Sequence, residues 1–218
     1  MNKNLLKIGI SILVIILGLF LLVQPSNNFV EEKDPQLTVE ERLIVENRLQ
    51  EAQKKMAEAL TNEEKFYAWM QIGFGQYGLG KYKEAKKSFL EAVDLEPNNY
   101  VVYVALYQVD LDRQDNQSAR KSIKKAISLK ETNPDLWRKY IQLEADRFFA
   151  SSEELNSFYQ EALVKTFSHI DIETSYAQFL EKSGNLKSAL DAWKKIYEQM
   201  LDPLYLGEIE RLEALLKL

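Results

Sequence analysis

One stretch of 34 residues, 66–99, combines small, apolar and helix-breaking residues at spacings that fit two short helices joined by a tight turn. Apolar side chains recur every three or four residues on both sides of the turn, so each helix carries one apolar stripe. The pattern consists of Trp69, Ile72, Gly73, Gly80, Tyr82, Ala85, Phe89, Ala92 and Pro97. A single helix pair of this kind cannot bury its own stripe, so the stretch predicts stacked copies.

These residues occupy the positions that characterise the tetratricopeptide repeat (TPR), which the stretch resembles at every position but one. The exception is Gln76, which stands where the repeat usually has tyrosine. Gly73 and Ala85 occupy the positions at which the two helices of a unit cross, where a larger side chain would push the helices apart. The resemblance implies a helix-turn-helix unit that stacks on copies of itself and binds other proteins.

Less regular copies of the pattern follow at approximately 100–133, 134–168 and 170–203. Tyr107 replaces the small residue of the second copy, so we expect a more open helix crossing there. The third copy carries a two-residue insertion relative to the first. The third and fourth copies also resemble half-a-TPR repeats, through the spacing of Trp137, Tyr140 and Glu144 and of Tyr176 and Phe179. The subclass of repeat therefore stays open.

A further helix is expected at each end of the repeats. Thr38 to Glu41 forms a capping box that starts a helix running to about Leu60. The segment 204–218 has the pattern of an amphipathic helix. Terminal helices of this kind cover the open ends of a repeat array. We therefore predict an all-α domain over residues 38–218: an α-solenoid of about four helix-turn-helix repeats, with capping helices at 38–61 and 204–218.

The N-terminal segment has the composition of a membrane-spanning helix. Residues 8–23 carry no charge, and two preceding leucines, with one lysine between, extend the apolar character to nineteen residues, roughly 29 Å of helix. Lys3 precedes this run and Lys7 lies within it, whereas acidic residues follow it. The positive-inside rule then predicts one transmembrane helix within 1–24, with its N-terminus in the cytoplasm. The linker 25–37 would lead to extracytoplasmic repeats.

A cleaved signal peptide is the alternative interpretation, because the apolar run is short and follows a basic segment. The exit sequence, residues 23–27, lacks the pair of small residues that such cleavage uses. The chain has no cysteine, which excludes acylation as a lipoprotein. Cleavage would make the protein secreted or periplasmic, whereas an uncleaved helix makes it a single-pass membrane protein.

Composition and motifs argue against catalysis and nucleic-acid binding. The net charge of −5 is opposite to that of nucleic-acid-binding surfaces. The single histidine, His169, lies at an expected helix start, which excludes multi-histidine metal sites and suits a structural role. Gly73 and Gly75 lie within an expected helix and not in a phosphate-binding loop. We therefore expect a protein that is not an enzyme, with no cofactor, metal or small-molecule substrate.

The resemblance to the TPR implies that four positions of each first helix face a concave groove. In the first two copies these are Tyr67, Met70, Phe74, Tyr77, Val101, Val104, Gln108 and Leu111. The third and fourth copies supply Asp135, Arg138, Gln142, Ala145, Asp171, Thr174, Gln178 and Glu181. The groove thus changes from apolar and aromatic to polar. The apolar part predicts a site for an apolar helix or extended peptide, unless the protein's own N-terminal helix or a second copy fills it.

Two further observations concern which partner the repeats could bind. The TPR domains that clamp a chaperone C-terminus use lysine and asparagine at positions where this chain has Met70, Phe74 and Ala105, so that clamp is absent. A basic cluster occupies one second helix and comprises Arg120, Lys121, Lys124, Lys125 and Lys130. It is interpreted as a solvated outer face, with an anionic partner or lipid headgroup as the alternative.

The sequence as a whole favours a membrane-anchored interaction module or scaffold that binds a partner segment in its groove. Its layout is similar to that of bacterial accessory subunits of envelope assembly and secretion complexes. One alternative is a cytosolic RNA-processing scaffold of the half-a-TPR type, which the apolar N-terminus and acidic composition disfavour. Another alternative is a non-catalytic subunit of an enzyme complex.

Overall fold

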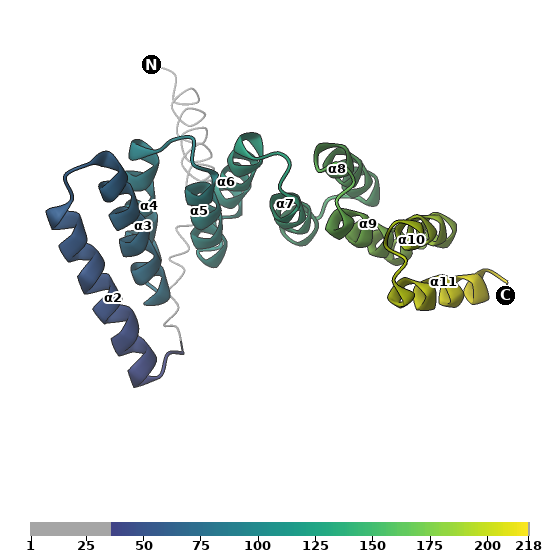
Figure 1. Ribbon diagram of the computed structural model, residues 1–218, viewed down its shortest axis with the longest axis horizontal. Coiled ribbons are helices and arrows are strands. Elements are labelled where there is room, and N and C mark those ends of the chain that lie inside the picture. Colours follow the sequence, from purple (N-terminus) through teal and green to yellow (C-terminus); the bar gives the residue numbers. More distant parts are fainter. Residues whose placement is uncertain (1–35, 218) are drawn as a thin grey trace, which may run out of the picture. The chain divides into compact units, whose positions relative to one another are not determined.

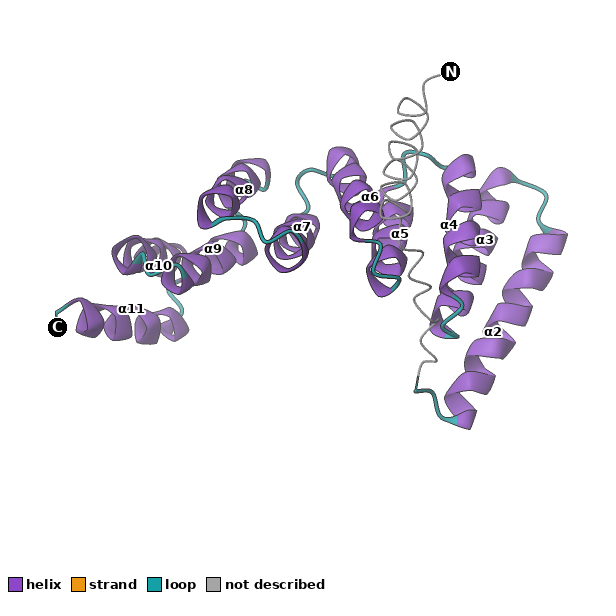
Figure 2. Cartoon of the chain, turned by 180° about the vertical axis from the view of Figure 1, so that it is seen from behind, coloured by secondary structure: helices purple, strands orange, loops and turns teal. Residues whose placement is uncertain are grey.

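The computed structural model describes residues 36–217, and over that range the chain forms ten α-helices and no strand (Figure 1 and Figure 2). Each of these helices contacts the next one along the chain, and α7 also contacts α9. This arrangement is the all-α repeat solenoid that the sequence predicts. The helices are α2 (Val39–Glu58), α3 (Asn62–Gly78), α4 (Tyr82–Leu95), α5 (Tyr100–Asp112), α6 (Asn116–Leu129), α7 (Pro134–Arg147), α8 (Ser152–Lys165), α9 (Ile170–Lys182), α10 (Leu186–Met200) and α11 (Pro203–Leu216).

Capping boxes define the starts of α2, α3 and α8. In each box a hydroxyl accepts a hydrogen bond from the N–H three residues on, and the glutamate there accepts one from the N–H of the capping residue. The pairs are Thr38 with Glu41, Thr61 with Glu64, and Ser151 with Glu154. The box predicted at Thr38 is confirmed, and α2 ends at Glu58, slightly before the expected Leu60.

The helix crossing in the first repeat depends on Gly73. A Cβ added at Gly73 would lie only 2.5–2.9 Å from three ring atoms of Phe89 in α4. Phe89 is 1% exposed and Ala85 is fully buried, so neither side of the crossing has spare volume. The prediction that small residues let α3 and α4 approach closely is confirmed at this site.

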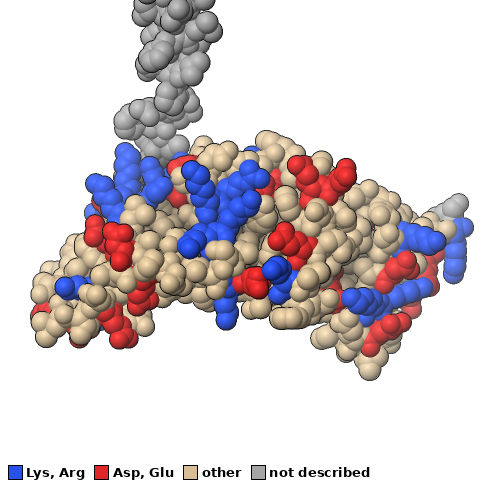
Figure 3. All heavy atoms as spheres, turned by 90° about the horizontal axis from the view of Figure 1, so that it is seen from above, with Lys and Arg blue, Asp and Glu red and all other residues tan. Residues whose placement is uncertain are grey.

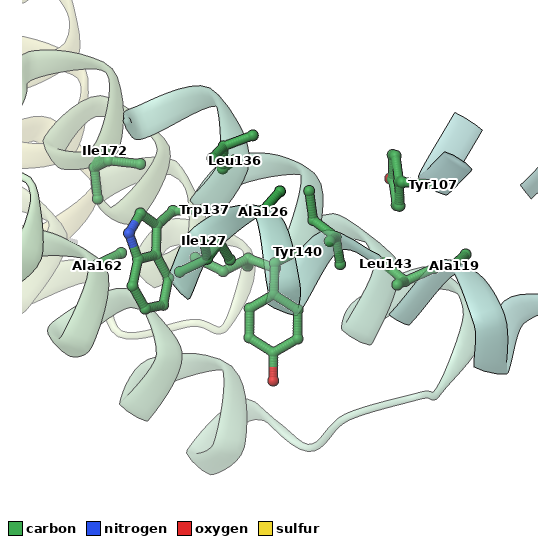
Figure 4. Close-up of a cluster of buried hydrophobic side chains, with 12 residues drawn as sticks. Tyr107, Ala119, Ala126, Ile127, Leu136, Trp137, Tyr140, Leu143, Ala162 and Ile172 are labelled. Atoms are coloured by element: carbon green, nitrogen blue, oxygen red, sulfur yellow. The ribbon is translucent and has the colours of Figure 1, made fainter. Parts of the chain in front are cut away.

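Successive repeats share their buried cores. The cluster around Trp137 and Tyr140 takes side chains from five consecutive helices, α5 to α9 (Figure 4). Tyr107, the large residue at the second crossing, belongs to this cluster, and its hydroxyl donates to the Lys139 carbonyl oxygen in α7 at 3.4 Å. Helix α8 contributes a single buried residue, Ala162. Its other apolar contacts with this cluster come from half-buried residues: Leu155, Phe158, Tyr159 and Leu163.

Two ion pairs join neighbouring repeats at equivalent positions. Lys86 Nζ of α4 lies 2.6 Å from Asp110 Oδ1 of α5. Arg120 of α6 makes a two-pronged bond to Glu144 of α7, with distances of 2.6 and 2.7 Å. Each pair is separated by 24 residues along the chain. Both carboxylates are buried, so each base also compensates a charge removed from water.

The ends of the described array are covered by α2 and α11. Leu49 and Ala52 of α2 pack with Ile72 of α3 in one small cluster. Ile209 and Leu212 of α11 join the cluster formed by α9 and α10. These two helices therefore bury apolar side chains of the first and last complete repeats, as expected of terminal helices.

None of the helices from α2 to α11 is long and apolar enough to cross a membrane. The transmembrane helix predicted within residues 1–24 lies outside the described residues, as do residues 25–35 of the predicted linker.

Candidate functional site

The predicted groove begins on α3, where two of its four positions are open to solvent. Tyr67 is 56% exposed and Phe74 is 51% exposed. The Phe74 ring also meets the Phe89 ring edge-on at 5.1 Å, so part of it rests on the core. Met70 is only 6% exposed and belongs to the core that α3, α4 and α5 share. The placement of Met70 in the groove was therefore wrong, because α5 covers that position.

Tyr77 has a structural connection to the next repeat. Its hydroxyl donates to Asp112 Oδ2 of α5 at 2.5 Å, and Gln108 Nε2 donates to the same oxygen at 3.2 Å. Its ring lies 5.5 Å from that of Tyr82 in α4. Burial and the bond to Asp112 raise the pKa of Tyr77 well above its ordinary value. Tyr77 thus holds α3 to α5, and Gln108 supports the same carboxylate from within α5.

The groove positions of α5 range from exposed to half-buried. Val101 is 42% exposed at the start of the helix. Val104 and Leu111 are half-buried and pack against the core that continues into α7. The open apolar part of the predicted groove therefore consists of three residues: Tyr67, Phe74 and Val101.

A pocket of about 760 Å³ lies further along the repeats, between α7, α8 and α9. All four groove positions predicted for the third copy line this pocket, together with one from the fourth: Asp135, Arg138, Gln142, Ala145 and Gln178. The register of the repeat thus brings these side chains together on one surface. This pocket lies at the polar end of the predicted groove and not at its aromatic end.

Four apolar lining residues of the pocket were not assigned to the groove by the sequence analysis: Ile141 of α7, Leu155 and Tyr159 of α8, and Phe179 of α9. The rings of Tyr159 and Phe179 lie 5.1 Å apart. Burial raises the pKa of Tyr159, with Arg138 opposing it. Groove positions were assigned only to first helices, whereas α8 is a second helix. The insertion in the third copy was the available signal that α8 departs from the regular register.

The pocket combines this apolar wall with charges of both signs. Arg138 Nη1 lies 3.2 Å from Asp135 Oδ1, where both side chains are exposed and the pair is weak. Lys139 lies over the Tyr107 ring at 5.9 Å. Gln142 and Gln178 add amide donors and acceptors to the lining. Such a surface suits an extended peptide, whose backbone needs hydrogen-bond partners and whose side chains need apolar contacts.

Glu181, another predicted groove residue, has a structural role. It accepts a hydrogen bond from Trp193 Nε1 at 2.6 Å and forms an ion pair with Arg211 of α11. These bonds connect α9 to α10 and α11. Asp171 and Thr174 do not line the pocket either. The Glu181 carboxylate is thus engaged by α10 and α11.

The basic cluster on α6 is only partly a solvated face. Arg120 is engaged by Glu144, which corrects its assignment to a free outer surface. Lys124 lies over the Tyr140 ring at 5.3 Å, and Lys125 lies over the Tyr103 ring at 5.8 Å. All four lysines of the cluster are exposed, so only Arg120 departs from the predicted solvated face. Figure 3 shows Lys and Arg side chains gathered on the face of the repeats that it draws.

The single histidine caps a helix. His169 Nδ1 accepts a hydrogen bond from the Asp171 N–H at 3.3 Å, at the start of α9. Within residues 36–217 no three His, Cys, Asp or Glu side chains come together in a way that could hold a metal ion.

The fold and its register define an α-solenoid of stacked helix pairs, and comparison with known proteins assigns the repeat. Residues 66–99 match the family model described as tetratricopeptide repeat. The arrangement is similar to YrrB, described as a TPR protein with an unusual peptide-binding site, at 17% identity and a TM-score of 0.52, covering 78% of this chain and 84% of that one. MamA is similar at 15% identity and a TM-score of 0.54, covering 74% and 94%. A tetratricopeptide repeat protein from Parabacteroides merdae ATCC 43184 is similar at 12% identity and a TM-score of 0.56, covering 78% and 70%. The chain therefore contains a TPR and has a TPR-like fold.

Proposed function

We propose that this protein is a non-catalytic interaction module that binds an extended segment of a partner protein along the concave side of its repeats. The observation that carries the proposal is the pocket of about 760 Å³, which is lined by the groove positions of α7 and by Gln178 of α9. The peptide-binding site ascribed to YrrB, a protein of similar fold, supports the same use of the repeats.

The composition of the groove favours a partner segment with two different ends. Tyr67, Phe74 and Val101 offer exposed apolar surface on α3 and α5. The pocket between α7 and α9 offers amides, both charges and the Tyr159 and Phe179 rings. A segment with apolar residues toward the first repeats and polar residues toward the last would match both parts.

The proposed cellular setting is a membrane. The apolar run before residue 24 and the lysines that precede it support an uncleaved anchor, with the repeats outside the cytoplasm. In that setting the repeats would present a partner segment next to the bilayer, as an accessory subunit of an envelope assembly or secretion complex does.

The proposal is tested by filling the pocket. Gln142 and Gln178 are exposed lining residues, and replacing both with arginine adds bulk and charge without removing a core side chain. The full-length protein is captured from detergent-solubilised membranes, and partners are quantified by mass spectrometry. A matched control replaces the exposed Gln53 of α2 and Gln199 of α10 with arginine. We expect the pocket variant to lose the partner that the wild type and the control retain. Equal capture by all three would contradict a binding site in the pocket.

A further inference from the structure

The exposed side of α6 carries positive charge and no acid. Residues 116–130 contain five bases and no Asp or Glu. The apolar residues of the helix are buried, whereas Lys121, Lys124 and Lys125 are exposed on the opposite side. At 100° per residue these three lysines lie within about 100° of one another, so they point the same way.

Helix α4 extends this basic side into the preceding repeat. Lys86 and Arg120 occupy equivalent positions, since each pairs with a buried carboxylate 24 residues further along the chain. Lys87 and Lys121 follow them directly, and both are exposed. They therefore occupy the same side of successive second helices. We call the four exposed lysines together the lysine face: Lys87, Lys121, Lys124 and Lys125.

The charges of the lysine face are not compensated by the fold. Within residues 36–217 none of its four lysines forms an ion pair with a carboxylate. Lys124 and Lys125 lie over tyrosine rings, which position their ammonium groups without neutralising them. The equivalent residues of α10 are Lys194 and Lys195, and each of these pairs with a carboxylate at 2.7 Å. The lysines of α6 thus keep a charge that α10 compensates internally.

The lysine face does not continue into the third repeat. Allowing for the two-residue insertion, α8 has Ser157, Gln160 and Glu161 at the positions of the three α6 lysines. The uncompensated positive charge is therefore confined to α4 and α6, in the part of the array that is nearer in sequence to the proposed anchor.

We propose that the lysine face docks on the anionic phospholipid surface of the bilayer in which the protein is anchored. Each lysine near an anionic surface strengthens binding by about fivefold, and clusters of about four or more are typical of such docking. The residues between the proposed anchor and α2, 25–38, span at most about 50 Å even when extended, so the repeats stay beside the bilayer. Only this tether rests on the function proposed above.

A bilayer suits the lysine face better than a nucleic acid or an acidic protein. The net charge of the chain is −5, so a long polyanion that reached beyond the lysine face would be repelled by the rest of the protein. Leu90, one turn after Lys87, is 46% exposed and adds an apolar contact for the headgroup region of a bilayer. None of the four lysines lines the concave pocket, so docking leaves that pocket open for a partner segment.

The first test measures vesicle binding of the unit from Asp34 onward, which is compact by itself and lacks the proposed anchor. Its outcome is therefore independent of the anchor. We expect flotation with phosphatidylcholine vesicles that contain about one-third phosphatidylglycerol, none with pure phosphatidylcholine, and release as salt rises from about 0.05 to 0.5 M. Equal binding to both vesicles, or to neither, would overturn the proposal. Tighter binding to an RNA oligomer or to polyglutamate than to the anionic vesicles would also overturn it.

Matched variants locate the binding on the lysine face. Replacing Lys121, Lys124 and Lys125 with glutamine should weaken binding to the anionic vesicles on the order of 100-fold, and Lys87→Gln alone about fivefold. The control variant removes the same charge at exposed positions elsewhere and should change binding less than about threefold: Lys54→Gln, Lys187→Gln and Lys217→Gln. Equal weakening by the two triple variants would show that net charge, and not this face, determines binding.

The second test follows docking in the full-length protein, reconstituted in nanodiscs. Acetylation rates of single lysines are measured by mass spectrometry. We expect the four lysines of the lysine face to react several-fold more slowly in discs with phosphatidylglycerol than in pure phosphatidylcholine discs, whereas Lys187 and Lys217 react equally in both. Equal rates for the lysine face in the two kinds of disc would contradict docking. Recovery of the protein in the phosphatidylcholine discs reports separately on the anchor.

Discussion

At the scale of single residues, the packing of the repeats depends on where a side chain is missing. Gly73 allows the Phe89 ring to lie against the backbone of α3. Gly207 in α11, by contrast, has nothing within 4 Å of the position that a Cβ would take. The same residue type therefore has a packing role in one helix and none in the other.

This contrast predicts opposite effects of adding one methyl group. Gly73→Ala forces the buried Phe89 ring to move and should lower the free energy of unfolding by about 1–3 kcal/mol. Gly207→Ala places a better helix former at an open site and should raise it by about 0.5–1 kcal/mol. Urea denaturation of the unit from Asp34 onward, which is compact by itself, measures both. Equal effects of the two changes would refute the close crossing of α3 and α4.

Arg120 and Glu144 give a second prediction at this scale. Arg120→Ala leaves the Glu144 carboxylate, 2% exposed, without its partner and should cost about 3–5 kcal/mol in the free energy of unfolding. The exposed neighbour Lys121 is the control, since Lys121→Ala should stay within about 0.5 kcal/mol of the wild type. Replacing both Arg120 and Glu144 with leucine should restore most of the loss. A small effect of Arg120→Ala alone would show that the pair is not needed to compensate the buried charge.

The sequence predicted the repeat unit well and the free surface only in part. Spacing alone identifies which face of a helix a residue occupies. It correctly predicted that Gly73 and Ala85 lie at the helix crossing, and it predicted a common face for the four α7 residues that line the pocket. Whether a face is covered depends on the neighbouring helix. Met70 is covered by α5, and the Glu181 carboxylate is engaged by α10 and α11, through contacts distant in sequence that periodicity does not reveal.

At the scale of helices, α8 differs from the other members of the array. It buries one residue, Ala162, and yet it supplies Leu155 and Tyr159 to the concave pocket. Four further apolar side chains of α8 are half-buried against the shared core: Leu155, Phe158, Tyr159 and Leu163. The first turn of α8 is held by the capping box formed by Ser151 and Glu154.

Removal of the Ser151 cap should therefore loosen α8 selectively. Ser151→Ala leaves an amide of the first turn without its acceptor, at a cost of about 1 kcal/mol. Hydrogen exchange should speed up for the amides of α8 while those of α4 and α5 change little, because local opening need not involve the whole array. Uniform acceleration in all helices would instead show that α8 opens only with the rest of the domain.

The same cap predicts a pH dependence. The pKa of Glu154 is lowered mainly by the hydrogen bond from the Ser151 N–H. Because the folded pKa lies below the unfolded one, the stabilisation is complete above the unfolded pKa and is lost as the pH falls through the folded pKa. Glu154→Gln should therefore destabilise the protein at neutral pH and lose this effect once the pH has fallen below the folded pKa of Glu154. Glu153→Gln, beside it in the first turn, is the control. A destabilisation that persists at low pH would contradict the role of the charge.

At the scale of the molecule, one TPR motif at 66–99 is followed by helix pairs of the same arrangement but looser sequence. The chemistry of the groove varies along this array, from exposed aromatic side chains on α3 to a mixed pocket between α7 and α9. Variation of side chains on a constant scaffold is how repeat proteins set partner choice. The side chains that occupy successive groove positions would thus determine which partner binds.

The proposed topology is tested by reporters fused after Leu218. The lysines before the apolar run predict that the repeats lie outside the cytoplasm. A reporter that is active only outside the cytoplasm should therefore be active, and a cytosol-dependent reporter should be silent. The intact mass of the native protein then distinguishes an uncleaved anchor from a mature form that begins near Asn27. Activity of the cytosol-dependent reporter would contradict the orientation.

The central claim, that the concave pocket holds a partner segment, is tested most directly by site-specific photocrosslinking in native membranes. A photoreactive phenylalanine analogue is placed at Gln142 or Gln178, which line the pocket, and at Gln53 or Gln199, which do not. The account predicts one crosslinked partner from both pocket positions and none from the other two. Crosslinks that form only from Gln53 or Gln199, with the pocket positions silent, would contradict it.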